Sequence, residues 1–99
     1  MVNGMRPVHP GEILREDVLK PLDMSARQFA IALGVPANRI SQILAGERAI
    51  TADTALRLSK ALRTTPELWL NLQNSFDIKT SMLEIGKELE DIQPVNEAA

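Results

Sequence analysis

Residues 25–48 of this 99-residue chain read SARQFAIALGVPANRISQILAGER, which is two short amphipathic segments on either side of a turn. The first segment begins at Ser25, a residue type that commonly caps helices, and ends at Gly34, which tolerates the positive φ of a helix stop. The second segment begins at Pro36 and ends at Gly46. Apolar residues recur at helical spacing in both segments: Phe29, Ala30, Leu33, Ile40, Ile43 and Leu44. The pattern predicts two helices joined by a tight turn, which is a helix-turn-helix.

The second predicted helix has an outward face that contains no acidic residue. We call it the reading face, and it consists of Ala37, Asn38, Arg39, Ser41, Gln42 and Ala45. A DNA major groove is wide enough to admit a helix, Asn and Gln can pair bidentately with adenine, and Arg can pair with guanine or a phosphate. The face is therefore suited to reading DNA. The alternative is an ordinary solvated helix in a small all-α domain.

Helix signals continue on both sides of this motif, whereas strand signals are weak throughout. Pro10 suits the first turn of a helix, and Pro21 is expected to end that helix nearby. Thr51 is expected to cap a fourth helix. Thr65-Pro66-Glu67 combines a cap, a first-turn proline and a first-turn acid, and it predicts a fifth helix. We therefore expect an all-α, repressor-like domain of five or six helices.

The apolar phase slips in the last third of the chain. One line is formed by Trp69, Leu72 and Phe76, and a second, the C-terminal stripe, is formed by Ile78, Met82, Ile85, Leu89 and Ile92. The slip predicts a break near residues 77–81 and a sixth helix over 81–92. We accordingly divide the chain into a helix-turn-helix DNA-binding domain, residues 1–77, and an acidic C-terminal helix and tail, residues 78–99.

The charge is distributed unevenly along the chain. Residues 1–63 carry nine Lys or Arg and six Asp or Glu, a net charge of +3, whereas residues 64–99 carry two Lys and seven Asp or Glu, a net charge of −5. A basic front part fits a polyanionic partner, and the acidic back part suggests a different one. Solvated helix faces without a partner are the alternative.

Several classes of protein are disfavoured by composition. The chain has no cysteine, so it has no disulfide scaffold, thiolate metal site or thiol nucleophile. The N-terminal residues lack the apolar core of a signal peptide, and the longest apolar run, Phe29–Val35, is far too short for a membrane helix. His9 is the only histidine, and we expect it to serve the entry to the first helix rather than catalysis. We expect a cytoplasmic protein that is not an enzyme and holds no metal or cofactor.

Five blocks of sequence carry a family resemblance: His9–Leu14, Phe29–Pro36, Arg39–Thr51, Asp53–Leu58 and Thr65–Gln73. Together they span about two-thirds of the chain. They resemble the phage-repressor-like (XRE) helix-turn-helix family and, more narrowly, the HigA/VapI-type antitoxins of bacterial toxin–antitoxin systems. The resemblance implies an operator-binding homodimer that represses its own operon and neutralises a partner toxin. In such systems the toxin is usually a small ribonuclease that cleaves mRNA.

The resemblance also implies roles for individual residues. Ala37, Asn38 and Gln42 should face base edges, Arg39 a base or a phosphate, and Arg48 a phosphate. The complete DNA-binding set is Ser25, Arg27, Pro36, Ala37, Asn38, Arg39, Ser41, Gln42 and Arg48. Arg27 is equally well explained as a solvated arginine.

The surfaces for protein partners are less defined by the sequence. We expect Leu72 and Phe76 in a dimer seam, and Trp69 mainly in the core with an edge near that seam. The C-terminal stripe either packs on its own domain, contacts a second copy or binds a basic toxin through the acids around it. Two other functions stay open: a regulator without a toxin partner, and an interaction module that has lost DNA binding.

Overall fold

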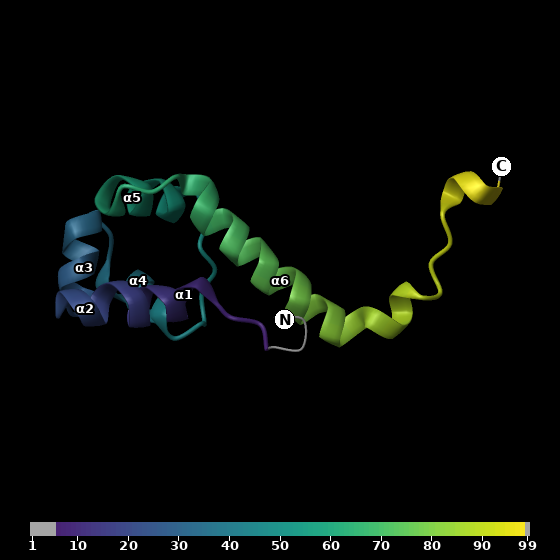
Figure 1. Ribbon diagram of the computed structural model, residues 1–99, viewed down its shortest axis with the longest axis horizontal. Coiled ribbons are helices and arrows are strands. Elements are labelled where there is room, and N and C mark those ends of the chain that lie inside the picture. Colours follow the sequence, from purple (N-terminus) through teal and green to yellow (C-terminus); the bar gives the residue numbers. More distant parts are fainter. Residues whose placement is uncertain (1–5, 99) are drawn as a thin grey trace.

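The structure is a computed structural model that describes residues 6–98, and these residues contain helices but no strand (Figure 1). The first helical stretch consists of α1 (Pro10–Ile13), the π-helical η1 (Leu14–Leu19) and α2 (Lys20–Leu22). The helices that follow are α3 (Ala26–Leu33), α4 (Ala37–Leu44), α5 (Ala52–Leu62) and α6 (Pro66–Leu89), and a 3-10 turn, η2 (Val95–Ala98), comes last. The all-α prediction is confirmed. Residues 1–5 and 99, which belong to the predicted domain and tail, lie outside the described part.

Side chains cap three of the predicted helix starts: His9 before α1, Ser25 before α3 and Thr65 before α6. The Ser25 hydroxyl accepts from the backbone N–H of Gln28, and the Gln28 side chain accepts from the N–H of Ser25, which is a complete capping box. Thr65 accepts from the N–H of Leu68 at 3.2 Å. Thr51 occupies the N-cap of α5, but its side chain makes no capping bond there. Thr51 therefore has the predicted position at the start of the helix, but the capping hydrogen bond expected from its side chain is not formed.

The first helical stretch passes its proline before it ends. Pro21 lies inside α2, and the helix continues to Leu22. The residues before it, Leu14–Leu19, are wound as a π-helix, and the N–H of Lys20 bonds to the carbonyl of Arg15. A wider turn of this kind shifts the hydrogen-bond ladder by one residue just before a residue that has no N–H. The proline therefore ends the helix one residue later than its position suggests.

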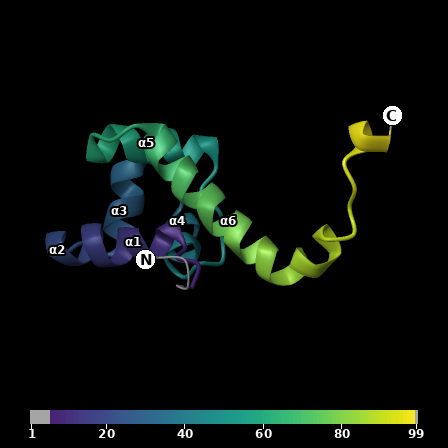
Figure 2. The ribbon, with the colours of Figure 1, turned by 45° about the vertical axis from the view of Figure 1, so that its right-hand side comes forward.

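One hydrophobic core lies between the helices. The fully or nearly fully buried side chains are Leu14, Leu19, Phe29, Ala30, Leu33, Ile40, Ile43, Ile50, Ala55, Leu58 and Trp69. In Figures 1 and 2, α5 lies opposite α1 and α4, α3 closes one end, and α6 crosses the other. Burial of each large aliphatic or aromatic side chain contributes roughly 1.5–3 kcal/mol.

The last helix is continuous, so the predicted break at residues 77–81 and the separate helix over 81–92 are wrong. α6 runs unbroken from Pro66 to Leu89. Its second half leaves the globule in both views, and the molecule is 55 Å long but only 26 by 24 Å across (Figures 1 and 2). Ile78 is 64% exposed and Leu83 78% exposed. The slip in the apolar pattern marks the point where the helix leaves its domain. Beyond that point the helix does not pack on the core, so its apolar residues need not continue on the face that Trp69, Leu72 and Phe76 share. The predicted boundary between residues 77 and 78 falls inside this helix.

Candidate nucleic-acid interface

The turn between α3 and α4 is fixed by backbone bonds and by one arginine. Gly34 has φ 72°, and its N–H bonds to the carbonyl of Ile31. The guanidinium of Arg57, on α5, donates to the carbonyls of Leu33 at 2.9 Å and Gly34 at 3.2 Å. Ala30 is buried at the point where the two helices approach each other. The two helices are therefore held at one angle, as a helix-turn-helix requires.

The reading face of α4 is presented to solvent as predicted, with one exception. Asn38 and Ser41 are exposed and Gln42 is half-buried, while Ile40 and Ile43 fill the core on the other side. The remaining small residues, Ala37 and Ala45, are exposed as well. The face therefore offers two amide side chains to a groove and leaves room for close approach.

The exception on the reading face is Arg39. Its guanidinium pairs with the carboxylate of Asp53, at the start of α5, with an N–O distance of 2.8 Å. The Nε of Arg57 reaches the same carboxylate oxygen at 2.8 Å. These two arginines, Arg57 first, lower the pKa of Asp53. Arg39 is thus directed toward another helix of its own domain in the free protein.

Asp53 and Arg57 are functional candidates that sequence reasoning missed. Their four-residue spacing on a helix indicates an ion pair within that helix. Nothing in the sequence indicates that the same carboxylate also holds Arg39, fourteen residues earlier. A long-range contact of this kind depends on the arrangement of α4 and α5, which both pack against α3.

The starts of α3 and α4 differ in how their first N–H groups are capped. Pro36 occupies the N-cap of α4 and supplies no side-chain bond, so the first turn has no side-chain cap. At the start of α3, the Ser25 hydroxyl accepts a hydrogen bond from the N–H of Gln28, and Ser25 is exposed. Arg27 and Arg48 are exposed too, and the ion pairs found in residues 6–98 include neither of them.

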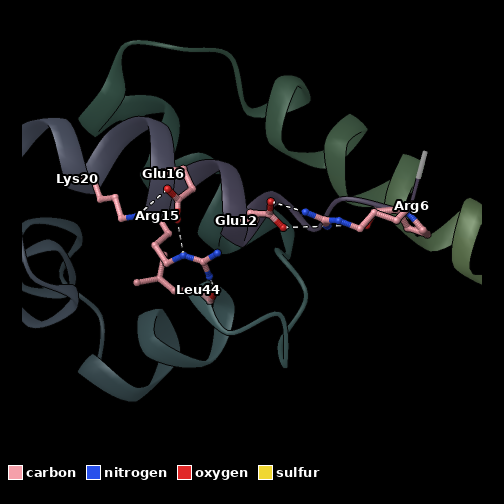
Figure 3. Close-up of polar contacts among 7 residues, drawn as sticks. Arg6, Glu12, Arg15, Glu16, Lys20 and Leu44 are labelled. Carbon is pink, nitrogen blue, oxygen red and sulfur yellow. Dashed lines mark hydrogen bonds and ion pairs between the residues drawn. The ribbon is translucent and has the colours of Figure 1, made fainter. Parts of the chain in front are cut away.

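The far end of α4 is held by Arg15, another residue that sequence reasoning missed. Its guanidinium donates to the carbonyl of Leu44 at 2.9 Å and pairs with Glu16, which also pairs with Lys20 (Figure 3). A cation at a helix C-terminus is favourable because the last carbonyls are partly negative. Figure 3 also shows a two-bond ion pair between Arg6 and Glu12, just before and at the start of α1.

The backbones of α1 and α4 touch at Gly11. A Cβ built on Gly11 would lie 1.7 Å from the carbonyl oxygen of Ile43. Neither atom belongs to a flexible side chain, so a larger residue cannot be accommodated without moving a helix. Together with Arg15, this contact fixes the position of α4 in the domain.

His9 lies at the entry to the first helix, as predicted. It is buried, its Nδ1 accepts from the N–H of Gly11 at 2.9 Å, and its ring meets Phe76 edge to face at 4.9 Å. Burial lowers the pKa of His9, against the smaller opposing effects of a hydrogen bond to the Arg48 backbone and of the negative charge of Asp77. The neutral imidazole therefore joins α1 to α6.

Stability is expected to depend on His9 as the pH falls below ~6.5, the ordinary pKa of a histidine. Its pKa is lower in the folded chain, so as pH falls the unfolded chain takes up the proton first and the folded state loses stability. Melting curves should show this loss in the wild type. His9→Asn keeps a capping oxygen without the titration, so its melting temperature should be lower at neutral pH and change less with acid. Equal pH dependence in both proteins would contradict the assignment.

The three predicted seam residues do not share one environment. Trp69 is 4% exposed, and its indole N–H donates to the Thr64 hydroxyl at 2.7 Å. Leu72 and Phe76 are half-buried against their own domain. Trp69 therefore has almost no surface left with which to meet a second copy at the seam.

α6 is also tied to the loop that follows α4. The buried side chain of Gln73 accepts from the N–H of Ile50 at 2.8 Å and donates to Asp77 at 3.0 Å. This bond fixes the loop that carries Arg48.

In the described part of the chain no cluster of potential metal ligands occurs, and none of its helices is long and apolar enough to cross a bilayer.

Comparison with known proteins gives a consistent result. The family model described as helix-turn-helix matches residues 16–69. Virulence-associated protein I of Dichelobacter nodosus is 49% identical over 78% of this chain and 71% of that protein. An addiction module antidote protein of a HigA family from Coxiella burnetii is 54% identical, with a TM-score of 0.87 over 91% of this chain and 99% of that one. Pseudomonas aeruginosa antitoxin HigA, solved with the higBA promoter, is 40% identical, with a TM-score of 0.87 over 90% and 98% of the two chains.

Proposed function

The chain belongs to the helix-turn-helix family and, within it, to the HigA/VapI group, and we propose that it is a DNA-binding antitoxin that represses its own operon. The observation that carries this proposal is the acid-free reading face of α4, fixed at both ends by Arg57 and Arg15. The promoter complex of the Pseudomonas aeruginosa relative supports the same use of the fold. The partner is double-stranded operator DNA, and the reported relatives are antitoxin-type or virulence-associated proteins rather than enzymes.

In this proposal the two amide side chains of α4, Asn38 exposed and Gln42 half-buried, read the bases. Asn38 and Gln42, with Ala37 and Ser41 beside them, face base edges in the major groove. Phosphate contacts come from Arg48, from Arg27 and from the helix starts at Ser25 and Pro36. The hydroxyl of Ser41 lies 3.3 Å from two carbonyls of its own helix, so it contributes less than the amides.

Assembly into a homodimer follows from the C-terminal stripe. Its helical members Ile78, Met82, Ile85 and Leu89 are between 38% and 64% exposed, so the alternative in which the stripe packs on its own domain is wrong for them. The spacings between successive members are four, three and four residues, and this order is the same from either end of the helix. Two antiparallel copies of α6 would therefore place Ile78 opposite Leu89 and Met82 opposite Ile85. The same register sets Lys79 opposite Glu88, which complements charge.

A partner toxin is the second half of the proposed function. The acids Glu84, Glu88, Glu90 and Asp91 are all exposed near the end of the chain. A ribonuclease that binds RNA presents a basic surface, and an acidic segment would complement it. We propose that the antitoxin neutralises such a protein, with DNA bound at the other end of the molecule.

The DNA half is tested by substitutions on the reading face. Asn38→Ala and Gln42→Ala should each cost about 1–3 kcal/mol at one base pair of the site and relax specificity there. Arg48→Ala should instead weaken binding to all sequences alike and reduce the salt dependence. Binding isotherms on a duplex selected by the wild type, and on its single-base variants, measure both effects. If neither amide variant changes affinity by more than about twofold, α4 is not the helix in the groove.

The toxin half is tested by the reading frame beside this gene. A small basic protein encoded there should arrest growth when expressed alone and should copurify with this chain when both are expressed. Arg48→Ala is the matched control, since it should keep the copurification and weaken DNA binding. A neighbour that neither arrests growth nor copurifies would make the protein a regulator without a toxin partner.

A further inference from the structure

We propose that Asp53 is a positioning residue for specificity, because it holds Arg39 in place on the reading face so that this arginine discriminates sequence instead of attracting any phosphate. The inference rests on the proposed DNA-binding function and adds a residue that lies outside the recognition helix. Arg39 is the third residue of α4, close to the bases in that proposal, and its side chain is only 28% exposed. Its guanidinium is 2.8 Å from the Oδ1 of Asp53.

Asp53 is itself a fixed group. Its Oδ1 also accepts from Arg57 at 2.8 Å, four residues along α5. Arg57 in turn donates to the two carbonyls that end α3. A chain of contacts thus runs from the turn of the motif through Arg57 and Asp53 to Arg39. Any shift of the turn would move the arginine on the reading face, so the geometry of the motif and the position of Arg39 are coupled.

A held arginine and a free one have different effects on DNA binding. A free guanidinium near DNA contacts whichever phosphate is within reach, which strengthens binding to every sequence equally. Asp53 offsets part of the charge of Arg39 and restricts its side chain. This leaves an arginine whose remaining donors point in one direction, as contact with a particular guanine or phosphate requires.

Arg48 provides the contrast within the same region. Arg39 and Arg48 line one hollow between α4, the following loop and the start of α5, together with Ala49, Thr51 and Thr54. Arg48 is exposed and takes part in none of the ion pairs formed within residues 6–98. Two arginines at one surface therefore have different roles: Arg48 supplies general attraction, and Arg39 supplies discrimination under the control of Asp53.

The test compares Asp53→Asn with the wild type on two duplexes. One carries the sequence that the wild-type chain selects from a random pool, and the other is a scrambled version of equal composition. Asp53→Asn frees Arg39. For each protomer, binding to the scrambled duplex should therefore tighten by about fivefold to tenfold near 0.1 M salt, and the slope of log affinity against log salt should steepen by about 0.9. The ratio of selected to scrambled affinity should fall by a similar factor. Asp53→Glu should restore most of that ratio, because it keeps the carboxylate.

Two further variants separate this role from a structural one. Glu47→Gln removes one negative charge from the loop beside Arg48 without touching Arg39, so it should raise both affinities together and leave the ratio unchanged. In an Arg39→Ala background, Asp53→Asn should no longer change the ratio. If Asp53→Asn instead lowers both affinities in proportion, or acts equally without Arg39, the residue is a scaffold only and the proposal is overturned. A wild type that selects no sequence overturns the proposed function, whereas a selective wild type with an unchanged Asp53→Asn ratio overturns only this inference.

Discussion

Gly11→Ala is expected to destabilise the domain by about 3 kcal/mol or more, the upper end of the cost of overpacking, because its new methyl group would overlap a backbone carbonyl. The Cβ would lie 1.7 Å from the oxygen of Ile43 and 2.6 Å from its carbon. α4 would have to move away from α1, and Ile43 would no longer be completely buried. A loss of this size lowers the melting temperature of a domain this small by on the order of 15 °C.

The control for this change is another glycine of the same chain. Gly86 lies inside α6, and a Cβ built there meets nothing within 4 Å. Gly86→Ala should therefore raise helix stability by up to about 1 kcal/mol. Thermal melts of both variants, with DNA binding measured below the transition, complete the comparison. If Gly11→Ala melts within a few degrees of the wild type, the close approach of α1 and α4 is not tight in solution.

Residues that act through their neighbours in the chain were predictable from the sequence. The cap at Ser25, the start at Thr65 and the turn at Gly34 each depend on a few adjacent residues, and all three are confirmed. The end of the first helical stretch near Pro21 is confirmed as well. The π-helical turn before Pro21 was not predictable, because it changes the hydrogen-bond register without a signal of its own in the sequence. The break expected after Phe76 is wrong for a different reason. The spacing of apolar residues indicates which face of a helix is buried, and it gives no information about helix ends where the helix projects from its domain.

The parts of the candidate site that could not be predicted depend on contacts between distant residues. Arg15 reaches the carbonyl of Leu44 across twenty-nine positions, and Arg39 reaches Asp53 across fourteen. In both cases the residue types are common surface charges, so composition gives no reason to single them out. The amides Asn38 and Gln42 were different, because their chemistry and their helical spacing together indicate a use. Their roles stay predictions.

Met82→Glu is expected to convert a dimer into a folded monomer and to reduce affinity for a two-fold symmetric DNA site by about 10²–10⁴-fold, since the second reading head would no longer be tethered. In the antiparallel register Met82 faces Ile85 of the other copy, so the change buries a carboxylate in an apolar seam. The side chain is 53% exposed in the single chain, which leaves the fold of the domain intact. Leu72→Glu is a poorer test, because Leu72 packs on its own core.

Leu83→Glu supplies the matched control for the seam. Leu83 is 78% exposed on the same helix but lies outside the C-terminal stripe, so the same charge there should leave the dimer and DNA binding unchanged. Sedimentation of wild type, Met82→Glu and Leu83→Glu at micromolar concentration measures the assembly, and binding to the selected duplex measures its consequence. A wild-type monomer would refute the seam. If Met82→Glu stays dimeric and binds DNA but no longer copurifies with the neighbouring protein, the stripe is the toxin surface, because the helix then serves the partner rather than a second copy.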